Sequence, residues 1–352
     1  MLRLILVVFL SLFPAGANAQ SLPDLVRERH PELAEADWPQ LTQLSLAGSG
    51  LRSLDGIERF SGLEQLDVSN NEIVDLAPLS GLGALTRLNF LGNNVSDLGP
   101  LARMDSLVVV TFGYNPIASL EPLRAHPSLR VINARDVGQS DWSVLASIPA
   151  MAGVWIGENG IETLEWAREL EGLVHLIVHD NPIDDLSPVA GLLRLRQLNI
   201  DHTQIRDLSA LAELDTLESL TLQGLALEDT APLEGLGNLI RLDLRGNALR
   251  DVSGLSGMDT LSVLFLSDNQ ICSIAALEGL PALEWLMLDG NALEETGNLS
   301  RFPALGDLAI DEYALSESSR TAVSQAREAG LVVQTPDVRP VTYFVRPPSR
   351  SD

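Results

Sequence analysis

The chain has 352 residues, of which 48 are acidic and 23 basic, and its formal net charge is −25 at pH 7. So acidic a chain is a poor match for nucleic acid or for an anionic membrane, because binding phosphate requires clustered cations. Cys272 is the single cysteine, so no disulfide can form within the chain. It follows Ile271, and we expect it to pack as a small apolar side chain.

Residues 1–19 have the pattern of a secretory signal peptide. Arg3 is followed by the apolar run 4–13, and Ala17 and Ala19 form a small-residue cleavage motif. The apolar run is too short to span a bilayer comfortably, which favours a cleaved signal over an uncleaved anchor. We therefore expect a secreted protein, in the periplasm or the medium, with no membrane insertion after cleavage.

Residues 20–40 are predicted to form an N-terminal cap. The stretch 21–35 has the apolar spacing of a short amphipathic helix, with Leu22, Leu25 and Val26 on its inner face. A cap is expected here because a repetitive array begins at the next residue and would otherwise expose its core.

A pattern of apolar residues begins at Leu41 and returns every 22 residues without an insertion or deletion. A fixed period of this size indicates a solenoid, in which each repeat packs only against its neighbours. Thirteen repeats, the last one partial, occupy residues 41–316. Their first residues are Leu41, Leu63, Leu85, Leu107, Leu129, Met151, Leu173, Leu195, Leu217, Leu239, Leu261, Leu283 and Leu305.

The second repeat, residues 63–84, shows what each repeat is built to form. Leu66 and Val68 are two residues apart, which is the spacing of a strand with one buried face. The apolar residues after them recur every three residues, which favours a tight 3₁₀ turn over a long α-helix. Asn71 follows the strand, where an inward amide can satisfy backbone groups that lose their strand partners. Asp75 precedes a leucine and can cap the turn.

This pattern, LxxLxLxxNxL, resembles the leucine-rich repeat family. In the return segments 73–79, 95–101 and 183–189, Asp precedes a leucine and a proline follows two residues after it. These segments resemble the 22-residue subtype found in bacterial internalins. The resemblance implies an α/β solenoid of horseshoe shape, with a parallel β-sheet on the concave face, 3₁₀ or short helical turns on the convex face and helical caps at both ends. It also implies a bacterial source, because the chain lacks the cysteine-rich caps that are usual in extracellular members from animals.

The repeats end after Leu315, and residues 317–335 are predicted to form a C-terminal cap. We expect a helix over residues 317–329 that stops at Gly330, followed by a short strand at 331–333. Residues 336–352 contain four prolines and are predicted to be an extended tail.

The third, fifth, seventh and eighth residues of each repeat are expected to face outward and to form columns across neighbouring repeats. Histidines and carboxylates share these columns in the centre of the chain, and the spacing predicts His179 beside Asp201 and Asp180 beside His202. A divalent metal takes such ligands. Paired, solvated charges are the alternative that we favour, so we predict no bound metal and no cofactor. The cluster comprises Glu158, His175, His179, Asp180, Asp201 and His202.

Large apolar residues in the same columns indicate a partner, because such side chains are seldom left facing water without a function. They form two groups. The first comprises Val109, Tyr114, Val131, Trp155 and Ile177, and the second comprises Val263, Phe265, Trp285 and Met287.

The fifth repeat, residues 129–150, departs from the pattern beside the first of these groups. Ala134 replaces a core leucine, Val137 replaces the Asn and Gln139 replaces the usual isoleucine. We expect this repeat to stack less regularly on its neighbours.

No sequence motif for catalysis is found, so the sequence favours a non-enzymatic protein that binds a protein partner through its concave face. A glycan-binding envelope protein is the first alternative, since exposed aromatic rings also stack on sugars. A metal-dependent enzyme using the central histidines and carboxylates is the second. The residues expected to bind the partner are Tyr114, Trp155, Ile177, His179, Asp201, His202, Phe265, Trp285 and Met287.

Overall fold

A computed structural model describes residues 21–29 and 31–334. The predicted signal peptide and the predicted Pro-rich tail lie outside the described residues. Contacts divide the chain into two compact units, with unit 1 ending at Thr221 and unit 2 beginning at Leu222. No helix within the described part is both long and apolar enough to cross a membrane.

Unit 1 contains helix α1 (Leu22–Arg29) and nine parallel strands that follow one another in sequence order. Each strand is three residues long and each is followed by a 3₁₀ turn. The strands are β1 (Gln43–Ser45), β2 (Gln65–Asp67), β3 (Arg87–Asn89), β4 (Val109–Thr111), β5 (Val131–Asn133), β6 (Gly153–Trp155), β7 (His175–Ile177), β8 (Gln197–Asn199) and β9 (Ser219–Thr221). The turns are η1 (Glu35–Gln40), η2 (Ile57–Arg59), η3 (Ala77–Gly81), η4 (Gly99–Arg103), η5 (Glu121–Leu123), η6 (Ser143–Ser147), η7 (Glu165–Ala167), η8 (Ser187–Val189) and η9 (Ser209–Leu211).

Unit 2 has five parallel strands, also in sequence order, and the C-terminal helix α2 (Glu317–Glu328). The strands are β10 (Arg241–Asp243), β11 (Val263–Phe265), β12 (Trp285–Met287), β13 (Asp307–Ala309) and β14 (Val332–Gln334). The turns are η10 (Ala231–Leu233), η11 (Ser253–Leu255), η12 (Ala275–Leu277), η13 (Leu299–Arg301) and η14 (Glu312–Ala314).

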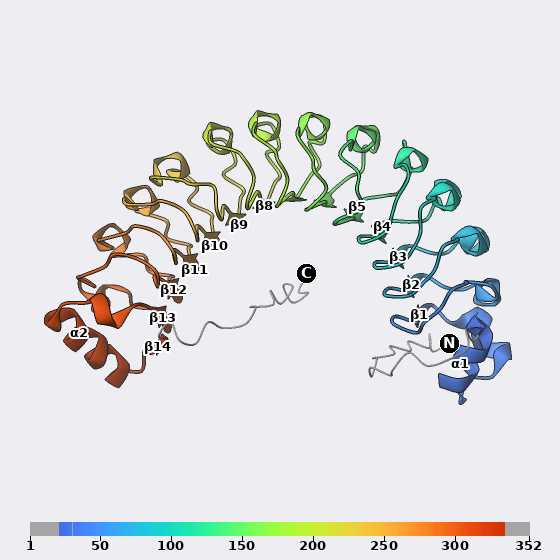
Figure 1. The fold of residues 1–352 in the computed structure, drawn as a ribbon, viewed down its shortest axis with the longest axis horizontal. Coiled ribbons are helices and arrows are strands. Elements are labelled where there is room, and N and C mark those ends of the chain that lie inside the picture. The colour runs from blue at the N-terminus through green and yellow to red at the C-terminus, as the bar shows by residue number, and fades with distance from the viewer. Residues whose placement is uncertain (1–20, 30, 335–352) are drawn as a thin grey trace. The chain divides into compact units, whose positions relative to one another are not determined.

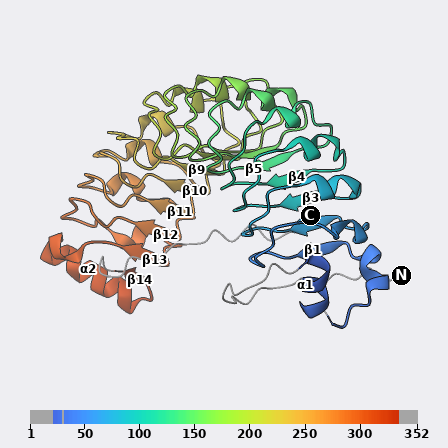
Figure 2. The same cartoon turned by 45° about the vertical axis from the view of Figure 1, so that its right-hand side comes forward.

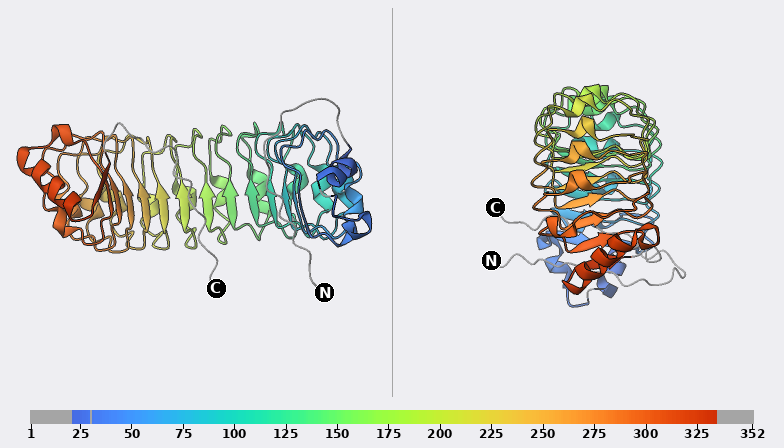
Figure 3. Two further views of the ribbon diagram at one scale, coloured as in Figure 1. Left: turned by 90° about the horizontal axis from the view of Figure 1, so that it is seen from below. Right: turned by 90° about the vertical axis from the view of Figure 1, so that its left-hand side faces the viewer.

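In each unit the strands lie on the inner side of a curved stack and the 3₁₀ turns on its outer side (Figure 1). Figures 2 and 3 show the strands of each unit side by side and pointing the same way. Leucines and other apolar side chains from the strands and turns fill the space between these two layers, where almost all are fully buried. The predicted α/β solenoid of leucine-rich repeats is therefore confirmed.

The strand register follows the 22-residue period. Leu66 pairs with Leu88, and the other residues of these strands pair at the same offset. The fifth repeat, for which we expected irregular stacking, keeps the register on both sides, since Ile132 of β5 pairs with Val110 and with Val154. Trp142 helps to explain this, because its fully buried indole occupies the position of a turn leucine in other repeats and donates to the Gln139 carbonyl at 2.8 Å.

An inward asparagine at the ninth residue of most repeats bonds the backbone where the strand ends, as the sequence predicted. The Asn71 side chain donates to the carbonyls of Leu46 and Val68 at 2.9 and 2.8 Å, and it accepts from the N–H groups of Ser49 and Leu51. One amide thus satisfies backbone groups of two neighbouring repeats where the chain leaves the strand. The predicted turn caps are also present, because Asp75 Oδ1 accepts from the N–H of Ala77 at 2.8 Å.

Both helices lie at the ends of their units. Helix α1 buries Leu22, Leu25 and Val26. Trp38, in the turn η1 that follows this helix, stacks on Phe60 with ring centroids 4.7 Å apart. At the C-terminal end of unit 2, Ser316 caps α2 and β14 pairs in parallel with β13.

Candidate functional site

The outward side of the sheet in unit 1 is almost free of charge. In β1–β9, the middle residue of each strand is buried and the flanking residues, third and fifth in the repeat, face outward. Among these flanking residues only Asp67 and Arg87 carry a formal charge, in a chain of net charge −25. The others are mainly amides and hydroxyls, with Trp155 as the largest side chain. This face is therefore suited to hydrogen bonding and stacking rather than to attracting an ion over a distance.

A hollow of about 270 Å³ lies over β1–β4 on this face. The hollow was not predicted from the sequence, although the polar residues that line it recur at 22-residue spacing. The polar lining residues are Gln43, Ser45, Gln65, Asp67, Arg87, Asn89 and Thr111.

The Trp155 ring lies along the sheet and is partly exposed. It stacks on the His175 ring with centroids 5.5 Å apart and 28° between the planes. It also lies over Gly153, because a Cβ at Gly153 would be 2.4 Å from Trp155 Cζ3. Burial lowers the pKa of His175, so its ring is favoured in the neutral form that stacks against an indole without adding charge.

The structure corrects one prediction for this face. Trp155 and Ile177 are direct neighbours across β6 and β7, as the repeat spacing predicted. Ile177, however, is only 7% exposed, so it supports the sheet rather than offering a large apolar surface. Tyr114 is 43% exposed and remains available for contact.

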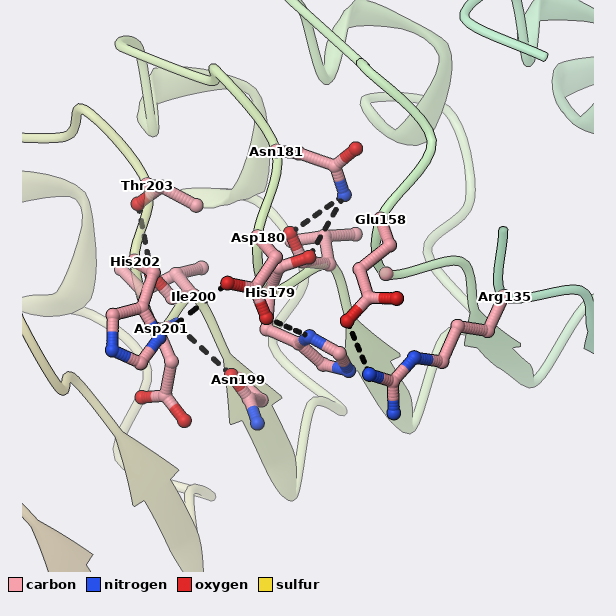
Figure 4. A network of polar contacts seen from close by, with 12 residues as sticks. Arg135, Glu158, His179, Asp180, Asn181, Asn199, Ile200, Asp201, His202 and Thr203 are labelled. Atoms are coloured by element: carbon pink, nitrogen blue, oxygen red, sulfur yellow. Dashed lines mark hydrogen bonds and ion pairs between the residues drawn. The ribbon is translucent and has the colours of Figure 1, made fainter. Parts of the chain in front are cut away.

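A row of polar contacts runs along the edge of this face, where the strands end (Figure 4). The Arg135 guanidinium lies 5.9 Å from the centroid of the Tyr114 ring and forms an ion pair with Glu158. The hydrogen bond from Arg135 lowers the pKa of Glu158, so this carboxylate stays ionised.

The row continues through the next two repeats. His179 Nδ1 lies 2.8 Å from Asp180 Oδ2, and His202 Nδ1 lies 3.6 Å from Asp180 Oδ1. The predicted proximity of Asp180 and His202 is thus confirmed. The His179 ring contacts Asp180, its neighbour in the chain. Asp201, which the spacing placed beside His179, is only 7% exposed, and its backbone N–H donates to Asn199 Oδ1 at 2.9 Å.

The eighth residue of the first twelve repeats has a left-handed backbone, with φ between 50° and 73°. Glycine accepts this conformation, and Asn and Asp tolerate it, whereas other residues are strained by roughly 1–2 kcal/mol. Nine repeats use one of the tolerant residues, and the three exceptions are Tyr114, Glu158 and His202. All three belong to the edge row. The tolerant residues are Gly48, Asn70, Gly92, Asp136, Asp180, Gly224, Gly246, Asp268 and Gly290.

Unit 2 carries a second, more apolar group on its strands. Phe265 pairs with Met287, while Val263 pairs with Trp285, so the predicted neighbours are confirmed. Phe265 is only 7% exposed, which corrects the expectation that it faces water. It is covered by Arg245, whose guanidinium lies 5.1 Å from the ring centroid.

Two polar features of unit 2 differ from expectation or were missed. Arg245 is held by Asp243 at 2.6 Å, and the Asp243 side chain is only 5% exposed. Cys272, which we expected to be packed, is exposed. Its place beside buried Ile271 gave the wrong prediction because every third residue of this segment is buried, Ile271 and Ile274, and the two between them face solvent.

The fold of this chain is a leucine-rich repeat solenoid with a 22-residue period, and it is similar to the fold of solved internalins. Comparison with solved structures finds an internalin from Listeria monocytogenes, 24% identical, covering 90% of this chain and 95% of that chain with a TM-score of 0.77. A leucine-rich repeat protein from Leptospira interrogans is 17% identical and covers 79% and 74% of the two chains with a TM-score of 0.68. At these identities the likeness concerns the fold.

Other comparisons add little to this assignment. The LRIM1/APL1C complex is 19% identical over 83% of this chain and 57% of the matched chain, with a TM-score of 0.54. No protein-family model matches the sequence. No curated protein matches it either.

Proposed function

We propose that this is a secreted, non-enzymatic bacterial protein that binds a protein partner through the outward face of its strands. In unit 1 the contact would centre on Trp155 and on the edge row formed by Tyr114, Arg135, Glu158, His179, Asp180 and His202. In unit 2, Trp285 and Met287 would provide a second contact. Binding is favoured over catalysis because an open sheet face excludes water poorly, which weakens electrostatic stabilisation of a transition state.

The observation that carries this proposal is the strain in the edge row. Tyr114, Glu158 and His202 keep large side chains at a backbone position where every other one of the first twelve repeats has Gly, Asn or Asp. Strained conformations of this kind persist mainly where a side chain serves a function. Because the three positions lie in repeats four, six and eight and belong to one row of contacts, they mark a surface rather than a single site.

Two further observations support the proposal. The partly exposed Trp155 ring resembles the large aromatic anchors that dominate binding energy in protein interfaces. Leucine-rich repeat chains of similar fold occur in the LRIM1/APL1C complex. Secretion is supported by the signal-like sequence of residues 1–19 and by the fold shared with an internalin.

The test begins with a photo-reactive benzoylphenylalanine at position 114. The full-length protein is expressed in its source, irradiated and recovered, and the control carries the same group at Val74, which is 59% exposed between β2 and η3. We expect one discrete cross-linked protein at position 114 and none in common with position 74. The cross-linked partner is then purified. Its affinity for the Trp155→Ser variant should be at least tenfold lower than for the unchanged protein, whereas its affinity for the Val74→Ser variant should be the same. Identical cross-links at both positions, or equal affinities, would overturn the proposal.

The hollow over β1–β4 favours a second candidate, a site for a neutral glycan. Its amide and hydroxyl lining, with one Arg and one Asp, suits the hydroxyl groups of a sugar and gives no electrostatic advantage to a charged ligand. An array of neutral and acidic glycans tests this candidate. We expect neutral glycans to bind and Gln65→Ala to abolish the signal. Binding that Gln65→Ala leaves intact would exclude the hollow.

A further inference from the structure

We propose that Glu158, His179 and Asp180 form a binding site for a divalent transition-metal ion of the zinc class. This site lies on the edge row of unit 1 and does not depend on whether a protein partner binds there. It also differs from our interpretation of the sequence, which favoured paired, solvated charges.

The geometry of three side chains from two adjacent repeats points to this site. One ligand atom from each of Glu158, His179 and Asp180 lies within 4.8 Å of the other two. Figure 4 shows the His179 ring between the carboxyl groups of Glu158 and Asp180. An ion that bonds to such atoms at about 2.0–2.2 Å fits among them with small side-chain rotations.

The His179 ring is held in position by its surroundings. It lies over Gly157, where an added Cβ would be 2.5 Å from His179 Cε1 and 2.6 Å from Nε2. Its side chain is only 19% exposed. The absence of a side chain at residue 157 therefore lets the ring lie next to Glu158. A ligand held in one orientation before the metal arrives loses less entropy on binding.

Asp180 has two roles available to it, as a ligand or as a support for His179. Its Oδ2 lies 2.8 Å from His179 Nδ1, and a carboxylate on one ring nitrogen orients the other nitrogen toward a metal. His202 adds a fourth candidate donor, since its Nδ1 lies 3.6 Å from Asp180 Oδ1 and its side chain is 56% exposed.

Arg135 competes with a metal for this site. It forms an ion pair with Glu158, and both side chains are partly exposed, at 43% and 34%. An exposed ion pair of this kind is weak, so a divalent ion can displace the guanidinium from Glu158. Removing Arg135 should therefore strengthen metal binding, an effect opposite to that of removing any ligand.

The donor set selects the kind of ion. Imidazole nitrogen together with carboxylate oxygen suits zinc and related transition metals, whereas calcium takes six to eight oxygen ligands. Zinc is therefore expected to bind and calcium is not.

The test is calorimetric titration of the full-length protein with zinc alone and, separately, with calcium alone. We expect one zinc ion per chain and no saturable calcium signal. His179→Ala and Asp180→Asn should each weaken zinc binding at least tenfold, whereas Arg135→Gln should strengthen it several-fold. Asp136→Asn is the matched control, because it changes a carboxylate at the same backbone position as Asp180, two repeats earlier. The affinity of this variant for zinc should equal that of the unchanged protein.

Three results would overturn the proposal. They are the lack of a one-to-one zinc signal, equal affinities for the unchanged protein and His179→Ala, and weaker binding by Arg135→Gln. The Arg135 result does not depend on the stability of the ligand variants, so a fold damaged by His179→Ala leaves the proposal testable.

Discussion

Gly153 and Trp155, two residues of strand β6, form a matched pair, because the indole ring of Trp155 lies in the space that a side chain at Gly153 would occupy. A Cβ there would be 2.4 Å from Trp155 Cζ3. Neighbouring strands have Val131 and His175 in the same column. The glycine is thus required for the orientation of the ring and not for any turn of the backbone.

Replacing Gly153 by Val should therefore lift the Trp155 ring away from the sheet. We expect the indole to become more accessible to acrylamide, which quenches tryptophan fluorescence. Subtracting the quenching of a G153V/W155F double variant from that of G153V isolates the contribution of Trp155. Gly191→Ala is the control, since nothing lies within 4 Å of a Cβ at that position. Unchanged quenching in G153V would show that the ring has another support.

Replacing His202 by Gly should stabilise the protein. The left-handed backbone at His202, φ 54°, strains a histidine but not a glycine. Relief of this strain outweighs the larger conformational entropy of glycine in the unfolded chain, so the free energy of unfolding should rise by roughly 0.5–1 kcal/mol. Urea unfolding measures the shift. Asp268→Gly, at the same position of another repeat, should gain less because Asp tolerates this conformation. A loss of stability in His202→Gly would refute the assignment of strain.

Buried His126 should make stability depend on pH. It is 2% exposed, burial lowers its pKa, and it occupies the position of Met104 in the preceding repeat. In the unfolded chain His126 is protonated below about pH 6.5, whereas in the folded protein it stays neutral to a lower pH. Since the unfolded state then binds more protons, stability falls as pH decreases from about 6.5 toward the lower folded pKa, by at most about 1.4 kcal/mol per pH unit.

The variant His126→Met should weaken this dependence, leaving the part due to His175, and should be more stable than the unchanged protein at pH 5. Urea unfolding at pH 5 and pH 8 measures it. Met104→Leu changes the same position one repeat earlier and should leave the pH dependence as it was. Parallel pH profiles for His126→Met and the unchanged protein would show that another group titrates.

Replacing Asn93 by Ala should destabilise the fold by about 2–4 kcal/mol. The Asn93 amide donates to Val68 and Phe90 carbonyls at 3.0 and 2.8 Å and accepts from the Ile73 N–H at 3.0 Å. Removing the amide leaves buried backbone groups without hydrogen-bond partners. Each such group costs about 1–3 kcal/mol of stability before the structure relaxes around it. Exposed Asn94→Ala should change stability by less than about 0.5 kcal/mol. Equal unfolding midpoints for the two variants would contradict this role.

Much of the fold could be predicted from the sequence, because the period of 22 residues fixes the register of the strands within the repeats, although not that of β14. Thus the neighbours Trp155 and Ile177 follow from counting alone. What counting cannot give is how far a side chain is covered. Phe265 is hidden by Arg245, which comes from the preceding repeat, and Ile177 is buried within a curved sheet. These contacts depend on side-chain length and orientation.

Two features had a signal in the sequence that was not used. His126 occupies a column that is otherwise apolar, as Met104 and Ile148 show in the flanking repeats. The left-handed position was equally visible, because Gly, Asn and Asp dominate the eighth residue of the repeats. Columns of backbone conformation are thus as informative as columns of apolar side chains.

The central claim is that the edge row of unit 1 keeps strained residues because they bind a partner. The most direct measurement is of stability and affinity together in Tyr114→Gly, using the purified protein that cross-links at position 114. We expect a higher unfolding midpoint than that of the unchanged protein and an affinity at least tenfold lower. A higher midpoint with unchanged affinity would contradict the claim, because the strain at Tyr114 would then serve no binding function.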